Sequence, residues 1–253
     1  GALRPDYIIP FRLDRQAAKD TLKKFYKGKL LLPRAFKSEN CIDKLQGVYV
    51  PFWLFDCNAD GTVHFNATRV STWRSGDYRY TKTSHFLVIR GGHMAFEKIP
   101  VDASEKMDDS YMDSLEPFDY RELTDFGTAY LSGFLTDRFD VSAKDSAPRA
   151  SRRVKQSLED SLRSTVHGYA SVTTRSTDIH TSDSQVKYAM LPVYILNTKY
   201  KDKPYFFAMN GQTGKFVGKL PISWGRFFAW AGGIAAAAVA LGQLFLLIGG
   251  MFG

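Results

Sequence analysis

The run VYVPFWLF (Val48–Phe55) has a near-copy later in the chain, AMLPVYIL (Ala189–Leu196). Each run is apolar, carries proline at its fourth position, and is followed by a polar turn and a second, aromatic run. Such runs are typical of β-strands. Because proline donates no ladder hydrogen bond, we expect Pro51 and Pro192 at a sheet edge or a bulge. The sequence thus predicts two related β-hairpin units, unless two apolar strands with a proline are alike by chance.

Working outward from these runs, turn residues at 58–61, 75–77 and 91–92 divide 47–101 into four expected strands. Three more strands are expected over 169–180, 185–196 and 204–217. A helix is expected to begin at Asp14, and an amphipathic helix over 148–167 has an apolar stripe (Val154, Leu158, Leu162, Val166). We predict an α+β fold of antiparallel sheets with a few packed helices, forming one domain over 1–222 that divides at about 138/139.

The C-terminal segment 227–253 contains no charged residue, and Gln243 is its one clearly polar side chain. A helix of this length would reach about 40 Å, and the hydrocarbon core of a bilayer is about 30 Å thick. The segment is apolar on all sides, which favours a transmembrane helix over a core helix or an in-plane helix. Since the sequence opens at Gly1, we expect a fragment, and a second span after residue 253 stays open.

Basic residues precede this segment in excess and predict that the soluble domain faces the cytoplasm. They are Lys199, Lys201, Lys203, Lys215, Lys219 and Arg226, with Asp202 as the only acid. Of these, Lys215, Lys219 and Arg226 are expected to flank the membrane. Two cysteines, Cys41 and Cys57, fit a reducing compartment. The predicted location is the cell membrane, with a C-terminal anchor and a cytoplasmic domain.

The formal charge of +8 is unevenly distributed along the chain. Residues 102–125 hold nine acids, which predict a solvated acidic face or a docking surface for a basic partner. The amphipathic helix carries Arg149, Arg152, Arg153 and Lys155, which we expect on its solvent side as a basic surface. Membrane lipid and nucleic acid are both partners for such a surface, and charge alone does not separate them.

No pattern of catalytic or metal-binding residues stands out. The segment NGQTGKF (210–216) has too few residues between its glycines for a phosphate loop, so Gly211 and Gly214 are expected in a tight turn. The histidines and cysteines lack the spacing of a zinc site, and no cofactor is expected in this chain. In segment 74–80 basic residues alternate with tyrosines, whose rings could stack on the bases of single-stranded nucleic acid. A strand with one aromatic face turned inward is the commoner structure for such a segment.

Five stretches resemble bacterial membrane-anchored zinc-ribbon proteins of the YdjG-like kind. They are RPDYIIPF, GVYVPFWLFDC, IPVDASEKMDDSYMDSLEPFDY, AYLSGFLTDRFDV and FAMNGQTGKFVGKLPIS. The resemblance covers residues 3–253 and includes the order and spacing of the stretches. It implies paired CxxC zinc ribbons before PDYIIPF, so zinc is expected in that preceding segment. Family labels include a TFIIB-type zinc ribbon and a primosomal helicase, but no Walker A lysine or DEAH-like motif supports a helicase here.

These observations predict a membrane-tethered cytoplasmic interaction or scaffold module without catalytic activity, in a membrane-stress or envelope-associated assembly. Its expected partners are membrane lipid and other proteins. The second hypothesis is a nucleic-acid-associated protein in which the zinc ribbon and the basic helix bind. An enzyme ranks third, because neither a Ser/His/Asp set nor paired carboxylates nor a cofactor pattern is evident.

Overall fold

The computed structural model describes residues 3–251, with side chains over residues 3–243. The chain forms two compact units that alternate along the sequence. The larger unit comprises residues up to 10, 49–113 and 119–191, and the smaller unit comprises 11–48, 114–118 and the chain from 192 on. This division differs from the predicted one at about 138/139, because strands β2 and β6 each continue from one unit into the other.

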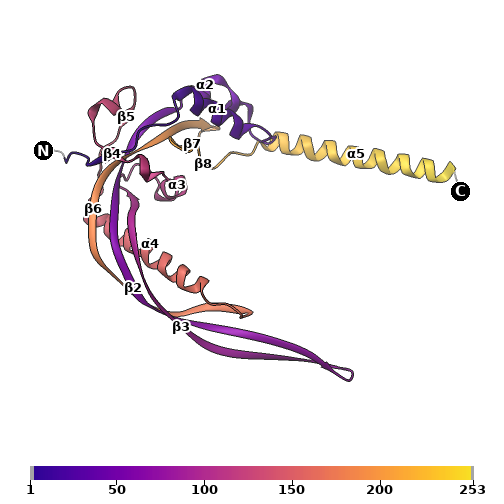
Figure 1. Cartoon of the computed structure of the whole chain (residues 1–253). Coiled ribbons are helices and arrows are strands. Elements are labelled where there is room, and N and C mark those ends of the chain that lie inside the picture. The colour runs from indigo at the N-terminus through magenta and orange to yellow at the C-terminus, as the bar shows by residue number, and fades with distance from the viewer. Residues whose placement is uncertain (1–2, 252–253) are drawn as a thin grey trace. The chain divides into compact units, whose positions relative to one another are not determined.

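The larger unit is built on a mixed sheet with the strand order β3-β2-β6-β1-β4 (Figure 1). Strand β5 pairs with β2, and β1 runs parallel to β6. The strands are β1 (Tyr7–Ile8), β2 (Gln46–Ser75), β3 (Tyr78–Asp102), β4 (Thr124–Asp125), β5 (Leu135–Thr136) and β6 (Ser171–Tyr200). The α+β class with antiparallel hairpins is confirmed, and β6 replaces two of the expected strands with one.

Two of the expected turns are wrong, because residues 58–61 and 91–92 lie inside one long β2/β3 hairpin. Its ladder pairs Gly61 with Gly92 and continues to the turn after Ser75. A Cβ on Gly61 would lie 2.2 Å from the carbonyl oxygen of Asp178, so glycine lets β6 approach β2 closely. A Cβ on Gly92 would lie 3.1 Å from Leu162. These glycines make room for close packing instead of reversing the chain.

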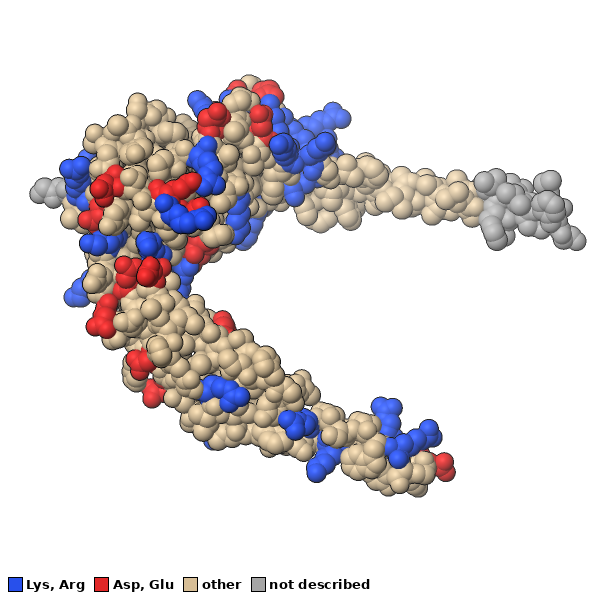
Figure 2. Space-filling view, viewed as in Figure 1, with Lys and Arg blue, Asp and Glu red and all other residues tan. Residues whose placement is uncertain are grey.

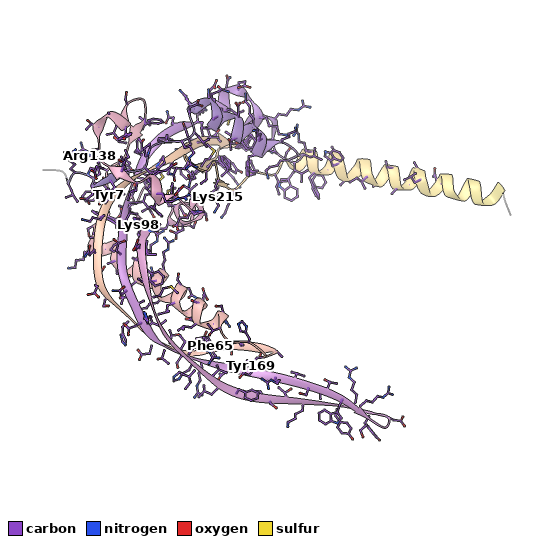
Figure 3. All side chains as sticks on the ribbon, viewed as in Figure 1. Tyr7, Phe65, Lys98, Arg138, Tyr169 and Lys215 are labelled. Carbon is purple, nitrogen blue, oxygen red and sulfur yellow. The ribbon has the colours of Figure 1, made fainter. Side chains whose placement is uncertain are left out.

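Helix α4 (Ala143–Ser164) covers the β2/β3 hairpin, and its predicted apolar stripe is buried. It begins five residues before the expected start, since the Ser142 side chain caps the backbone N–H of Asp145. Facing the stripe are small and aromatic strand residues, among them the fully buried Phe65 (Figure 3). Burial of this stripe, at roughly 1.5–3 kcal/mol for each large side chain, holds α4 on the sheet.

The smaller unit packs helix α1 (Arg15–Tyr26) against the far end of β6 and strand β7 (Lys203–Asn210). The Asp14 side chain accepts a hydrogen bond from the N–H of Ala17, which confirms it as the N-cap. The core includes Leu22, Tyr26 and Phe207. Its remaining elements are η1 (Arg34–Lys37), α2 (Glu39–Ile42) and β8 (Phe216–Gly218), the last paired with β7.

The two predicted proline-containing hairpins have the same local pairing. Beside Pro51, Phe52 is in register with Asp102, the last residue of β3, and the Pro51 carbonyl accepts from the N–H of Ala103. Beside Pro192, Val193 is in register with Asn210, the last residue of β7, and the Pro192 carbonyl accepts from the next N–H. Each proline therefore stands where a hairpin ladder begins, where its missing donor costs least. The bulge in β2 falls later, between Phe55 and Cys57.

The remaining elements are short segments and one long C-terminal helix. Helix α3 (Asp109–Leu115), η2 (Tyr120–Glu122) and η3 (Thr128–Leu131) connect the larger elements. Helix α5 (Trp224–Met251) begins three residues before the predicted segment, whose last two residues lie outside the described part. Its stretch Trp224–Gln243 is long and apolar enough to cross a membrane, and none of it is buried. By length and composition, α5 is a candidate membrane span.

Candidate anion-binding surface

The positive charge of the chain belongs entirely to the unit that carries α5. The smaller unit has 16 Lys and Arg against 6 Asp and Glu, a formal charge of +10. The larger unit has 18 against 20, a charge of −2. Blue side chains gather over α1 and beside the start of α5 in the space-filling view (Figure 2). Sequence reasoning missed this division, because the units are interleaved and no single segment displays it.

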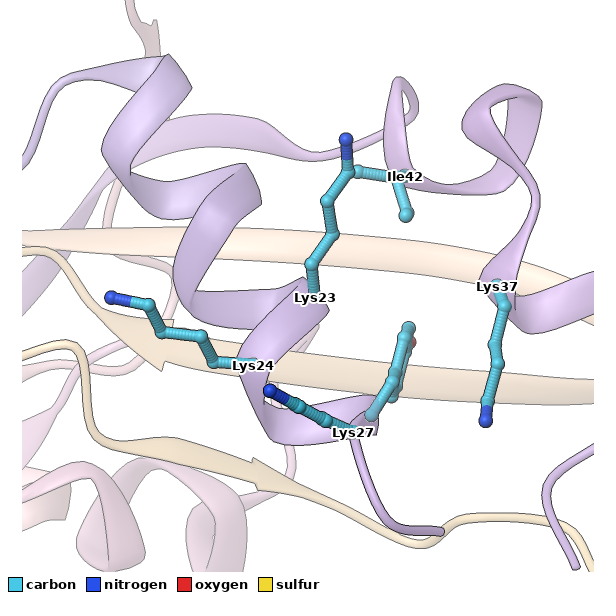
Figure 4. Close-up of a pocket in the computed structure, with 6 residues that line it drawn as sticks. Lys23, Lys24, Lys27, Lys37 and Ile42 are labelled. Carbon is cyan, nitrogen blue, oxygen red and sulfur yellow. The ribbon is translucent and has the colours of Figure 1, made fainter. Parts of the chain in front are cut away.

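Within the smaller unit, one hollow of about 350 Å³ has four lysines among its lining residues. Lys23, Lys24 and Lys27 come from α1 and the residue after it, and Lys37 ends η1 (Figure 4). Tyr26 and Ile42 complete the lining. Helical spacing brings Lys23 and Lys27 onto one face. Lysines gathered at one part of the surface create a positive potential that attracts anions.

Two groups at this hollow define its chemistry. Lys23 pairs with Glu39 at 2.9 Å, and this hydrogen bond raises the pKa of Lys23. The Tyr26 side chain is 2% exposed, and its buried hydroxyl has no hydrogen-bond partner. Burial raises the pKa of Tyr26 well above its usual value, so the hydroxyl keeps its proton and can donate. An unsatisfied buried hydroxyl costs about 1–3 kcal/mol.

The first turn of α5 is fastened to the loop that follows α1. The Arg226 guanidinium donates to the carbonyls of Leu30 and Leu32 at 3.2 and 2.6 Å, and the N–H of Ser223 donates to Leu31 at 2.8 Å. Arg226 is therefore half-buried and structural rather than a free flanking charge. Lys219, by contrast, is exposed. These hydrogen bonds therefore join the start of the candidate span to the segment of chain between Lys27 and Lys37.

The glycine-rich segment forms the turn between β7 and β8. Gly214 has a φ of +73°, and a Cβ on Gly211 would lie 2.6 Å from the Phe11 ring. The Asn210 side chain accepts from the N–H groups of residues 212 and 213, and Lys215 donates to the Glu116 carbonyl. Since these donors are already used within the protein, the segment presents no phosphate cradle.

Arg149 and Arg153 do not belong to a free basic surface, contrary to the prediction. The Arg149 guanidinium binds three carboxylates, those of Asp102 at 2.7 Å, Asp109 at 2.8 Å and Asp113 at 2.6 Å. Arg153 binds the Pro100 carbonyl. Three members of the acidic stretch thus neutralise Arg149, one of the four cations predicted for the basic surface.

Burial sets the ionisation of the central carboxylate of this network. The Asp102 side chain is 1% exposed, and its burial raises its pKa to about 6 even though Arg149 lowers it. The neighbouring helix positions Arg152 and Lys155 are exposed. Only these two of the four predicted cations stand out toward solvent.

The basic and aromatic segment 74–80 forms the closed end of the β2/β3 hairpin. Trp73 and Tyr80 stack across the ladder with ring centroids 5.6 Å apart, and both remain about half exposed. Arg74 and Arg79 are directly opposite one another. Like charges in this position are unfavourable, so the end of the hairpin suits an anionic partner.

Fold and charge together define the class: a two-unit α+β protein whose basic unit continues into a candidate membrane span. Among residues 3–251, no group of three or more His, Cys, Asp or Glu is placed to hold a metal ion. The chain is 43% identical over 253 residues to the "Uncharacterized protein YdjG" of Bacillus subtilis (strain 168), covering all of this chain and 74% of that protein. The chain therefore belongs to the YdjG family. No family model matches it. No solved structure matches it either.

Proposed function

We propose that this protein is a membrane-tethered interaction module whose smaller unit rests on an anionic membrane surface. The observation that carries the proposal is the +10 charge of the unit that continues into α5, beside a larger unit of −2. Each Lys or Arg that reaches an anionic leaflet gains about 1 kcal/mol. The excess of basic residues before the span favours the cytoplasmic side.

The larger unit would then serve as the scaffold that meets other proteins. Its sheet is long, near-neutral and exposed at the hairpin end, where Trp73, Tyr78 and Tyr80 are available to a partner. No catalytic activity is proposed for the chain. Zinc, as the YdjG-like resemblance implies, would be bound by a segment that precedes the PDYIIPF stretch in a longer chain.

Binding to vesicles tests the membrane proposal. The chain truncated after Ile222, checked for folding by circular dichroism, should sediment with phosphatidylglycerol vesicles and not with phosphatidylcholine vesicles. Lys24→Gln with Lys27→Gln should weaken binding by about 2 kcal/mol, roughly thirtyfold. Arg152→Gln with Lys155→Gln removes the same charge from the larger unit and should have little effect. Equal losses for the two pairs would contradict the proposal.

A nucleic-acid-associated role is the second candidate, favoured by the stacked aromatic pair and opposed arginines of the hairpin end. Stacking on such side chains contributes about 1–3 kcal/mol per base. Single-stranded DNA or RNA bound at physiological salt, and released by Trp73→Ala or Arg74→Glu, would favour this role over lipid.

A further inference from the structure

The closed end of the β2/β3 hairpin extends beyond the rest of the larger unit as a two-stranded arm, residues 69–83 (Figure 1). Strand β6 starts at Ser171, whose hydroxyl lies 2.7 Å from that of Thr68. Helix α4 ends at Ser164, and neither element accompanies the arm. Every residue of the arm is exposed. Because a hairpin without a third strand is marginally stable in water, an added strand would stabilise this part of the sheet.

The outer edge of β3 pairs with no other strand in the described part of the chain. The hairpin closes through a two-residue turn between Ser75 and Tyr78, which are in register. In such a hairpin the even-numbered residues of β3 hydrogen-bond to β2, and the N–H and C=O groups of the odd-numbered residues point outward. The carbonyl of Ile89 fits this alternation, because it accepts from the Arg90 side chain at 3.0 Å. The free part of the edge therefore spans residues 79–87.

The surface beside this edge is apolar and basic. Seven of the thirteen exposed large apolar or aromatic side chains that precede α5 lie between Val70 and Ile89, and Leu87 is 52% exposed. Segment 69–90 holds five Lys or Arg against Asp77 alone, a charge of +4 within a unit of −2 (Figure 2). None of these five cations lies within 4 Å of a carboxylate among the described side chains. They are therefore available to an acidic partner.

We propose that the outer edge of β3, over residues 79–87, accepts an extended acidic segment of a partner protein as an added strand. The backbone of this segment bonds the outward N–H and C=O groups, and its carboxylates pair with Arg79 and Lys82. Its apolar side chains cover Leu87. The inference deepens the proposed function, on which it rests for the larger unit as the part that meets other proteins.

The unpaired backbone edge favours a protein strand over other anionic partners. Lipid headgroups and nucleic-acid phosphates offer acceptors, but they do not offer a row of donors for the outward carbonyls. An extended peptide supplies both donors and acceptors at the spacing of the edge. A second copy of this chain is a poorer occupant, because pairing two such edges would bring two basic segments together.

The test measures binding of two labelled peptides to the full chain in neutral detergent, by fluorescence anisotropy. Both peptides match residues 79–87 in length, and valine alternates with glutamate in one and with lysine in the other. The glutamate peptide should bind at least about tenfold more tightly than the lysine peptide. In hydrogen exchange followed by NMR, the glutamate peptide should slow exchange at the outward N–H groups of Thr81, Thr83 and His85.

Two substitutions at Thr83 separate backbone pairing from side-chain contact. Thr83→Pro removes an outward N–H that β2 does not use, which an edge strand tolerates, so the unfolding temperature should stay that of the wild type. Binding of the glutamate peptide should weaken by about tenfold or more, because a hydrogen bond is lost and the proline ring obstructs the added strand. Thr83→Ala keeps the N–H and should bind as the wild type does.

Charge is tested separately from the backbone. Arg79→Gln with Lys82→Gln changes two exposed side chains and should weaken the glutamate peptide by about tenfold. Arg152→Gln with Lys155→Gln removes the same charge from exposed positions of α4 and should have no effect.

Binding of the glutamate peptide that Thr83→Pro loses and Thr83→Ala keeps supports the added strand. No binding, or equal binding by wild type and Thr83→Pro, overturns it. Single-stranded DNA released by Trp73→Ala and unaffected by Thr83→Pro, with no binding of the glutamate peptide, also overturns it and favours the nucleic-acid role. A dimer of the full chain that Thr83→Pro dissociates, seen by native mass spectrometry, assigns the edge to a second copy and overturns the acidic partner.

The vesicle experiment keeps this inference separate from the membrane proposal. Vesicle binding without peptide binding overturns the added strand and leaves the membrane proposal intact. Peptide binding that depends on the N–H of Thr83, without vesicle binding, supports the added strand and refutes the membrane proposal.

Discussion

Arg149→Met should destabilise the larger unit by an amount that depends on pH. The substitution keeps much of the apolar stem and removes the cation that binds Asp102, Asp109 and Asp113. At pH 7 the Asp102 carboxyl, with a pKa of about 6, is ionised in the wild type. Without Arg149 its pKa should rise further, which favours the protonated form of the buried carboxyl.

Proton uptake limits the cost. An Asp102 that stays protonated in the folded variant costs it about 1.4 kcal/mol at pH 7, because pH 7 is one unit above the wild-type pKa of about 6. The pairs with Asp109 and Asp113, whose side chains are 65% and 42% exposed, add at most about 0.5–1 kcal/mol each. The expected loss at pH 7 is therefore about 2–3 kcal/mol.

The sign of the pH dependence follows from the raised pKa. Between the unfolded pKa, near 3.9, and about 6, the folded protein binds more protons at Asp102, so stability falls as pH rises. The wild type levels off above pH 6, whereas Arg149→Met continues to lose stability toward pH 7. At pH 5 Asp102 is mostly protonated in both proteins, and the difference between them should shrink to about 1 kcal/mol.

Urea unfolding of the chain truncated after Ile222, at pH 5 and pH 7, measures this difference. Arg152→Met makes the same chemical change at an exposed position of α4 and should cost less than about 0.5 kcal/mol at either pH. A deficit of Arg149→Met that is equal at the two pH values, or that Arg152→Met reproduces, would refute the reasoning.

Three other predictions follow from the fold. Gly61→Ala should cost about 3 kcal/mol because its Cβ meets the β6 backbone, whereas Gly76→Ala, in open space at positive φ, should cost about 1 kcal/mol; thermal unfolding decides. Lys215→Ala should leave affinity for ATP unchanged, and micromolar ATP binding lost in that variant would be evidence for a phosphate loop. Deleting residues 224–253 should give a folded protein in the soluble fraction, since α5 is not part of the core, and aggregation would contradict this.

Patterns with a short period could be predicted from the sequence alone. The stripe of α4 and the cap at Asp14 depend on contacts within a few residues or on one helical face. The two proline-containing strands could also be recognised because their sequences are alike, and the structure gives both the same local pairing. In each case the residues that decide the local structure are close together in the sequence.

Long-range contacts explain what could not be predicted. Gly61 and Gly92 look like turn residues, because the sequence does not distinguish a glycine needed for close packing from a glycine needed for a turn. Arg149 looks like a surface cation because Asp102 is 47 positions away. The charge division between the units and the solitary hydroxyl of Tyr26 exist only once α1 packs on β6 and β7.

Amine footprinting of the full chain in nanodiscs tests the central claim most directly, because it reports on each lysine separately. If the smaller unit rests on an anionic leaflet, Lys23, Lys24, Lys27 and Lys37 should react several times more slowly in phosphatidylglycerol nanodiscs than in phosphatidylcholine nanodiscs. Lys155, exposed on the larger unit, should react equally in both. Equal labelling of all five lysines in the two lipids would contradict the claim.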